Sequence, residues 1–141
     1  MPLDHEIPIH PGILYAPVVS KLCNQLKIAE VLDYGAGKCE LFKHLQVNHA
    51  LTLQAYDPDV PSLAGKPLPS QLVCCLAVVP SLLDELRTLT LELGFLAGSD
   101  TDMLPELLKR WDIQMYQRTE HGFFAVVSNG DHDIRRATDC N

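Results

Sequence analysis

The chain has 141 residues and a formal net charge of −7, with 47% hydrophobic and 21% charged residues. This length and composition predict one domain that buries a real core. The acidic charge is spread along the chain, and no basic cluster is interleaved with aromatic residues, which argues against general nucleic-acid binding. No apolar run approaches the ~20 residues that a membrane span needs, so no membrane contact is predicted.

The first half of the chain alternates between helical and strand-like patterns. Residues 1–14 hold three prolines and Gly12, which predicts an irregular N-terminal arm. After the arm, the apolar spacing predicts a helix over 15–27, a strand over 30–34, a helix over 38–46 and a strand over 51–56. A proline-rich connection over 58–69 then leads to the next element.

The second half begins with an unbroken apolar run over 72–79, typical of a strand buried on both faces. Ser81 and Asp84 have the spacing of a capping box, and the apolar stripe of the helix that they start runs to Leu93. The remaining pattern predicts a strand over 94–98, a helix over 105–111 and strands over 113–118 and 123–128.

The last two strands decide the sheet pattern. Only a short turn around His121 and Gly122 joins them, and parallel strands need a crossover of about a dozen residues or more, so they form an antiparallel hairpin. The predicted fold is α/β, with a mostly parallel sheet that ends in this hairpin. The domain spans 15–128, and the charged remainder, 129–141, reads as a mobile polar tail.

The most informative stretch is Val31–Lys38, an apolar strand that runs into Gly35 and Gly37 and then into a helix. A strand, a Gly-x-Gly turn and a helix N-terminus together form a site for a ligand that carries a nucleoside. Asp57 follows Gly37 by 20 residues, after the second strand. This is about the ~20-residue spacing at which a carboxylate reaches ribose hydroxyls.

These residues carry a family resemblance. Val31–Lys38 resembles motif I of class I S-adenosylmethionine-dependent methyltransferases, and Tyr56-Asp57-Pro58 resembles their acidic second-strand motif. The likeness extends to residues 71–76, where such proteins place the fourth strand beside the adenine. The resemblance implies a Rossmann-like methyltransferase fold with strand order 2-1-4-5-7-6 in family terms and without strand three, because residues 58–69 are dominated by proline, serine and glycine.

The resemblance also implies S-adenosylmethionine as the cofactor. Its contacts would be made by Asp33, Gly35, Gly37, Asp57, Pro58 and Leu76. Asp33 would lie near the amino-acid portion, with the two glycines close to the methionine and the ribose. Asp57 would accept hydrogen bonds from the ribose hydroxyls, and the last two residues would flank the adenine.

The acceptor side departs from the family pattern. Cys39 replaces the third glycine, and residues 77–81 have no acid or base where many members carry them. Only residues 99–102 stand in place of the long segment that normally closes over the acceptor. The catalytic residues are therefore unknown. The candidates near the mouth are His10 and Tyr15, and Asp100 and Asp102, which we interpret as helix-start residues.

The cysteines indicate the redox compartment. Their number is odd, five, and no Cys-x-x-Cys occurs, which argues against a disulfide framework or a zinc site. Cys74 and Cys75 adjoin in a predicted strand and should point to opposite faces. Reduced thiols favour a cytoplasmic location. His44 and His49 straddle a helix end, so no metal site is predicted.

Two functional hypotheses follow from the intact donor side and the depleted acceptor side. The leading one is a small methyltransferase that acts on an unidentified small molecule or a group presented by a partner. The alternative is a non-catalytic module that binds S-adenosylmethionine or S-adenosylhomocysteine as a sensor or as a subunit of an assembly. A NAD-binding oxidoreductase would need a second mononucleotide half. Completion of the shortened fold by a homo-oligomer is left open.

Overall fold

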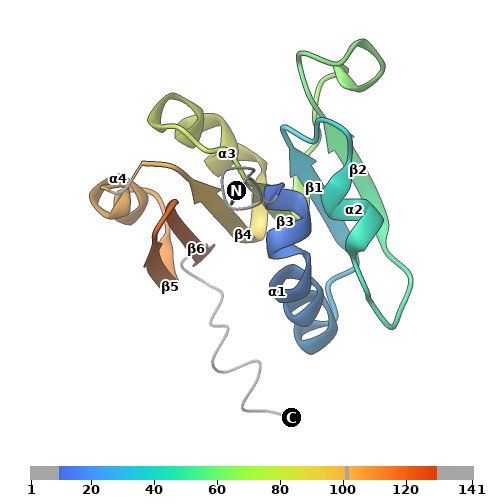
Figure 1. The fold of residues 1–141 in the computed structure, drawn as a ribbon, viewed down its shortest axis with the longest axis horizontal. Coiled ribbons are helices and arrows are strands. Elements are labelled where there is room, and N and C mark those ends of the chain that lie inside the picture. The colour runs from blue at the N-terminus through green and yellow to red at the C-terminus, as the bar shows by residue number, and fades with distance from the viewer. Residues whose placement is uncertain (1–9, 101, 130–141) are drawn as a thin grey trace, which may run out of the picture.

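A computed structural model describes residues 10–100 and 102–129 (Figure 1). The parts of the predicted arm and tail over 1–9 and 130–141 lie outside the described residues. In chain order the elements are α1 (Pro11–Leu26), β1 (Glu30–Tyr34), α2 (Glu40–His44), β2 (Thr52–Tyr56), η2 (Pro61–Leu63), β3 (Ser70–Cys75), η3 (Pro80–Leu82), α3 (Leu83–Leu89), β4 (Thr90–Gly98), α4 (Leu104–Leu108), β5 (Asp112–Thr119) and β6 (Gly122–Ser128).

The sheet has six strands in the order β2-β1-β3-β4-β6-β5. The first four run parallel, β6 is antiparallel to β4, and β5 pairs antiparallel with β6. The mixed α/β sheet and its closing hairpin are as predicted. Residues 57–69, between β2 and β3, form only the short turn η2. The side-chain amide of Gln54 bonds both the N–H and the C=O of Leu68, which holds this connection beside β2.

Helices cover both faces of the sheet (Figure 1). α1 and α2 pack on one face through Ala16, Val19, Cys23 and Leu41. α3 and α4 pack on the other through Leu83, Leu86, Leu89 and Leu107. Cys74 belongs to the first core and Cys75 to the second, which confirms that their side chains point to opposite faces.

The first helix begins earlier than predicted. α1 starts at Pro11, and the Nδ1 atom of His10 accepts a hydrogen bond from the Gly12 N–H, 2.9 Å away. Proline suits this first helical position because it has no N–H to leave unsatisfied. The irregular arm predicted over 1–14 is therefore wrong for residues 11–14. The start of α1 and its cap place Tyr15 and His10 near the carboxyl ends of the central strands.

The helix predicted to open at Pro80-Ser81 begins there, as the 3₁₀ turn η3 that leads into α3, but its predicted cap and its predicted end at Leu93 are wrong. The structure shows no side-chain cap where η3 and α3 begin, so the capping box does not form. α3 ends at Leu89, and Thr90 already pairs with Ser70 of β3. Burial in the sheet overrides the helical spacing of the leucines in this segment.

Two further elements, β3 and α2, are shorter than the apolar pattern predicts. β3 ends at Cys75 rather than at Val79, and the Val78 N–H donates to the Ala97 C=O. Residues 76–79 therefore form a turn beside the end of β4. α2 covers only Glu40–His44, because the glycine turn extends through Lys38 and a left-handed Cys39.

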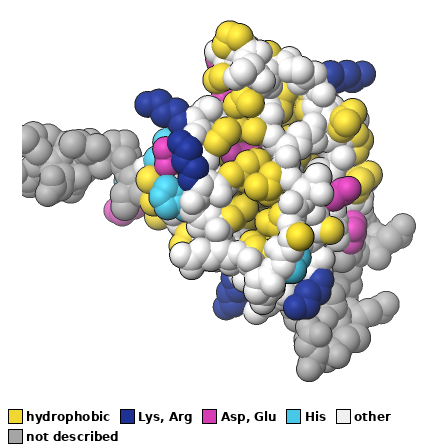
Figure 2. Space-filling view, turned by 90° about the vertical axis from the view of Figure 1, so that its right-hand side faces the viewer, with side chains coloured by type: hydrophobic (Ala, Val, Ile, Leu, Met, Phe, Trp, Pro, Cys, Tyr) yellow, Lys and Arg dark blue, Asp and Glu magenta, His cyan; other side chains and the backbone are white. Residues whose placement is uncertain are grey.

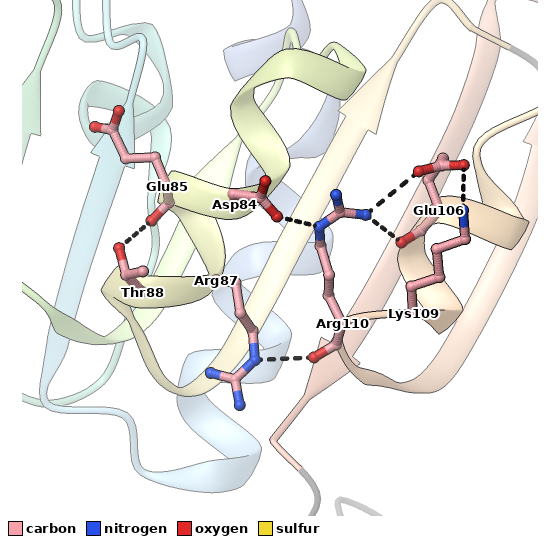
Figure 3. A network of polar contacts seen from close by, with 7 residues as sticks. All are labelled: Asp84, Glu85, Arg87, Thr88, Glu106, Lys109 and Arg110. Carbon is pink, nitrogen blue, oxygen red and sulfur yellow. Dashed lines mark hydrogen bonds and ion pairs between the residues drawn. The ribbon is translucent and has the colours of Figure 1, made fainter.

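A polar network fixes α4 against α3 (Figure 3). The Arg110 guanidinium donates to Asp84 of α3 at 2.8 Å and to the Glu106 carbonyl at 2.8 Å. The Arg87 side chain of α3 donates a hydrogen bond to the Arg110 C=O. These contacts lie away from the glycine turn, and their role is to hold the two short helices together.

The β2 side of the molecule has hydrophobic side chains gathered at its surface (Figure 2). Leu53 on β2 is 45% exposed, and Leu68 in the following connection is 64% exposed.

Within the described residues, no helix has the length and apolar content needed to cross a membrane.

Candidate functional site

The glycine turn after β1 is fastened to the end of β2. Gly35 and Gly37 have φ values of +85° and +55°, which favour glycine. The N–H groups of Gly35 and Ala36 both donate to the Tyr56 C=O, at 2.7 and 2.9 Å. The structure thus brings together the two motifs that the sequence analysis paired.

Asp57 makes the closest link between these motifs. Its Oδ2 atom accepts a hydrogen bond from the Gly37 N–H at 2.8 Å, and its Oδ1 atom accepts one from the Asp59 N–H at 2.9 Å. Each carboxylate oxygen has a second lone pair that remains able to accept a ligand hydroxyl. Asp57 therefore shapes the turn in addition to any contact that it makes with a ligand.

Cys39 occupies a position that suits glycine. Its φ of 60° and ψ of 34° are left-handed, and this residue precedes α2 without capping it. A side chain in this conformation costs about 1–2 kcal/mol relative to the right-handed region. The geometry explains why a third glycine would fit here and why the cysteine is a strained replacement.

Asp33 is the buried polar group of the site. It is 3% exposed, and burial, with a smaller contribution from the charge of Asp57, raises the pKa of its carboxyl to about 7. No hydrogen bond from a described residue contributes to this shift. A buried carboxyl without a donor is costly, and a ligand that brings a cation or N–H groups would relieve that cost.

Asp33 lines a small cleft of about 200 Å³. A Cβ atom built on Gly35, at the edge of this cleft, would meet nothing within 4 Å. The residues that line the cleft are His10, Pro11, Gly12, Asp33, Gly35, Leu41, Leu76 and Ala77. There is therefore open space beside this buried carboxyl.

A larger cleft of about 760 Å³ adjoins the small one. Its lining is Leu14, Tyr15, Val78, Val79, Ala97, Gly98, Ser99, Glu120 and His121, together with His10, Pro11, Leu76 and Ala77, which line both clefts. The two clefts meet at the carboxyl ends of β1, β3 and β4, where α/β sheets bind their ligands.

The predicted cofactor residues fall into two groups. Asp33, Gly35 and Leu76 line the clefts, and Leu76 is half-buried between them. The other three, Gly37, Asp57 and Pro58, line neither cleft and lie in the turns at the ends of β1 and β2, with Pro58 exposed.

His10 and Tyr15 both reach the larger cleft. Because the His10 Nδ1 atom accepts the Gly12 N–H, the neutral ring carries its proton on Nε2. In this arrangement the Nδ1 lone pair of His10 is taken up by the helix cap. The Tyr15 ring packs on Phe95 and Phe124, with centroids 5.4 and 5.6 Å away, and burial raises its pKa.

The two aspartates after β4 do not cap a helix. Asp100 Oδ1 accepts the Asp102 N–H at 2.9 Å, both side chains are exposed, and neither lines a cleft. The residue that precedes α4 is Met103, and it makes no side-chain cap. Their interpretation as helix-start residues is therefore wrong.

Sequence reasoning missed Glu120 and His121. They form the turn between β5 and β6 and line the larger cleft, with His121 Nε2 3.7 Å from Glu120 Oε1. Nothing in the local sequence indicates what this turn packs against.

Burial raises the pKa of the Cys75 thiol to about 12, so Cys75 is a protonated core residue rather than a nucleophile. Within the described residues, no group of three or more potential ligands is arranged for a metal ion.

Comparison with known proteins supports the fold. No protein-family model matches the sequence, and no curated protein matches it either. The solved structure of the 16S rRNA methylase ArmA matches with a TM-score of 0.56 and 15% sequence identity, over 81% of each chain. The chain therefore shares the α/β fold of that solved structure. At this identity the likeness extends to the fold alone.

Proposed function

We propose that the protein binds S-adenosylmethionine and transfers its methyl group to an acceptor. The observation that carries this proposal is the Asp33 carboxyl, buried with a raised pKa beside the open space at Gly35. The α-ammonium group of S-adenosylmethionine would supply the missing cation. The fold that the chain shares with the solved methylase structure supports the same assignment.

The residues present fit this cofactor. Asp33 would pair with the ammonium group, and the turn at Gly35 leaves space for the methionine chain. Asp57 has free lone pairs for the ribose hydroxyls, and Pro58 would border the adenine. Leu76, which lines both clefts, would lie between the cofactor and the acceptor. The cofactor would supply a methyl group on a sulfonium, which is electrophilic without help from a metal or a base.

The chain's own contribution to the reaction is positioning. The shared lining of the two clefts would bring donor and acceptor together, and alignment of reacting groups lowers the barrier by itself. The acceptor's nucleophilic atom would bond to the methyl carbon as the carbon–sulfur bond breaks and its electron pair stays on sulfur. The acceptor's proton would leave to solvent at the open mouth. The large second cleft favours an enzyme over a sensor, which needs no acceptor space.

Calorimetry tests the proposal. The wild-type protein should bind S-adenosylmethionine and S-adenosylhomocysteine but not NAD. Asp33→Asn should weaken binding about tenfold or more, since a hydrogen bond to a charged group contributes about 1.5–3 kcal/mol. Asp112→Asn, an exposed aspartate at the start of β5, is the matched control and should bind as the wild type does. A wild-type protein that binds neither adenosyl compound would refute the proposal.

A further inference from the structure

We propose that the larger cleft binds a small, largely apolar acceptor that carries no phosphate. This inference rests on the proposed function, because it names the class of acceptor for the same site. The structurally similar protein is named as a 16S rRNA methylase, and that name would suggest an RNA acceptor instead.

The apolar character of the cleft is the first observation. Its walls include Leu14 and Tyr15 from α1, and Leu76, Val78 and Val79 from the turn after β3. Its volume of about 760 Å³ lies within the range of clefts that enclose a drug-sized molecule. A molecule that fills such a cleft gains binding energy chiefly by removing apolar surface from water.

The charges around the cleft are the second observation. None of the residues that line it is a lysine or an arginine, and the ionisable groups there are His10, Tyr15, Glu120 and His121. Phosphate recognition relies on Arg and Lys, and RNA binding gains most of its affinity from neutralised phosphates. The Glu120 carboxylate and the net charge of −7 would instead repel a polyanion.

The third observation is that a hydrogen bond and close backbone packing hold the base of the cleft in place. The Val78 N–H donates to the Ala97 C=O at 2.9 Å, so the turn after β3 is tied to β4. A Cβ atom on Gly122 would lie 1.9 Å from the Gly98 carbonyl oxygen. The turn that carries Glu120 and His121 therefore sits directly against the end of β4. A pre-formed apolar cleft selects its ligand by shape.

The neutral, ring-bearing dye Nile red serves as the probe, with S-adenosylhomocysteine present. Dye fluorescence should report binding to the wild-type protein. Leu14→Glu should weaken dye binding about tenfold or more, because it places a charge in the apolar wall. Leu91→Glu is the matched control: Leu14 is 45% exposed and Leu91 is 52% exposed, but Leu91 lies at the start of β4, outside the cleft. Its dye affinity should match that of the wild type.

A single-stranded RNA oligonucleotide of mixed sequence provides the opposing arm, at physiological salt. The inference predicts that the RNA neither binds nor displaces the dye. RNA that displaces the dye, or equal dye affinity in the wild type and Leu14→Glu, would overturn it. Leu14 does not line the Asp33 cleft, so Leu14→Glu should keep its affinity for S-adenosylmethionine. Binding of S-adenosylmethionine without dye would overturn this inference alone, whereas dye binding without S-adenosylmethionine would overturn the proposed function.

Discussion

Replacing Asp33 by asparagine should make the stability of the protein less dependent on pH. Burial raises the pKa of this carboxyl from 3.8 to about 7, so the folded protein keeps a proton that the unfolded chain has already released. The stabilisation by that proton is complete below pH 3.8 and is lost as the pH rises through about 7. Asparagine has nearly the same shape but does not titrate.

The magnitude follows from the two pKa values. Within this window each pH unit changes the free energy of unfolding by about 1.4 kcal/mol. Between pH 5 and pH 8 the wild-type protein should therefore lose about 2.5 kcal/mol of stability relative to Asp33→Asn. Urea denaturation of both proteins at the two pH values measures this change. A stability difference between the two proteins that stays constant from pH 5 to pH 8 would refute the argument from burial.

Three further predictions concern the same site and its surroundings. S-adenosylmethionine should bind about fivefold more tightly at pH 7 than at pH 6, because the Asp33 carboxyl must ionise to pair with an ammonium group; equal affinities by calorimetry would contradict this. Cys39→Gly should raise the free energy of unfolding by about 1 kcal/mol, because φ at this residue is 60°, whereas Cys39→Ala should not; urea denaturation compares the two. Gly122→Ala should lower the free energy of unfolding by more than ~3 kcal/mol, because its Cβ would clash with the Gly98 carbonyl. The control Gly65→Ala, whose Cβ would meet nothing within 4 Å, should change it by less than ~0.5 kcal/mol. Similar melting temperatures for the two alanine variants would argue against the close packing of the hairpin turn.

Local patterns in the sequence predicted the six strands and the closing hairpin, but not all of the strand bounds. β1 matches its predicted bounds, since a short apolar run before two glycines fits few other structures. The closing hairpin followed from the length of one turn. The boundary between α3 and β4 was missed because leucines at 86, 89 and 93 fit a helical stripe, and only pairing with β3 places Leu93 in a strand.

The site was predicted only in part, because its contacts join distant segments. The spacing of Asp57 from the glycines is visible in the sequence, but its hydrogen bond to the Gly37 N–H is not. For that reason Asp57→Ala would disturb the turn as well as the ribose contact, and Asp33→Asn is the cleaner test. The role of His10 as a cap could have been read from Pro11, since proline favours the first position of a helix.

The central claim, that Asp33 receives the ammonium group of the cofactor, is tested most directly by NMR. A pH titration that follows the carboxyl carbon of Asp33 would give its pKa in the free protein and with S-adenosylmethionine at saturation. We predict a pKa of about 7 in the free protein and a value well below this with the cofactor bound, because an adjacent cation favours the ionised carboxylate. An Asp33 pKa that does not change when S-adenosylmethionine binds would contradict the claim.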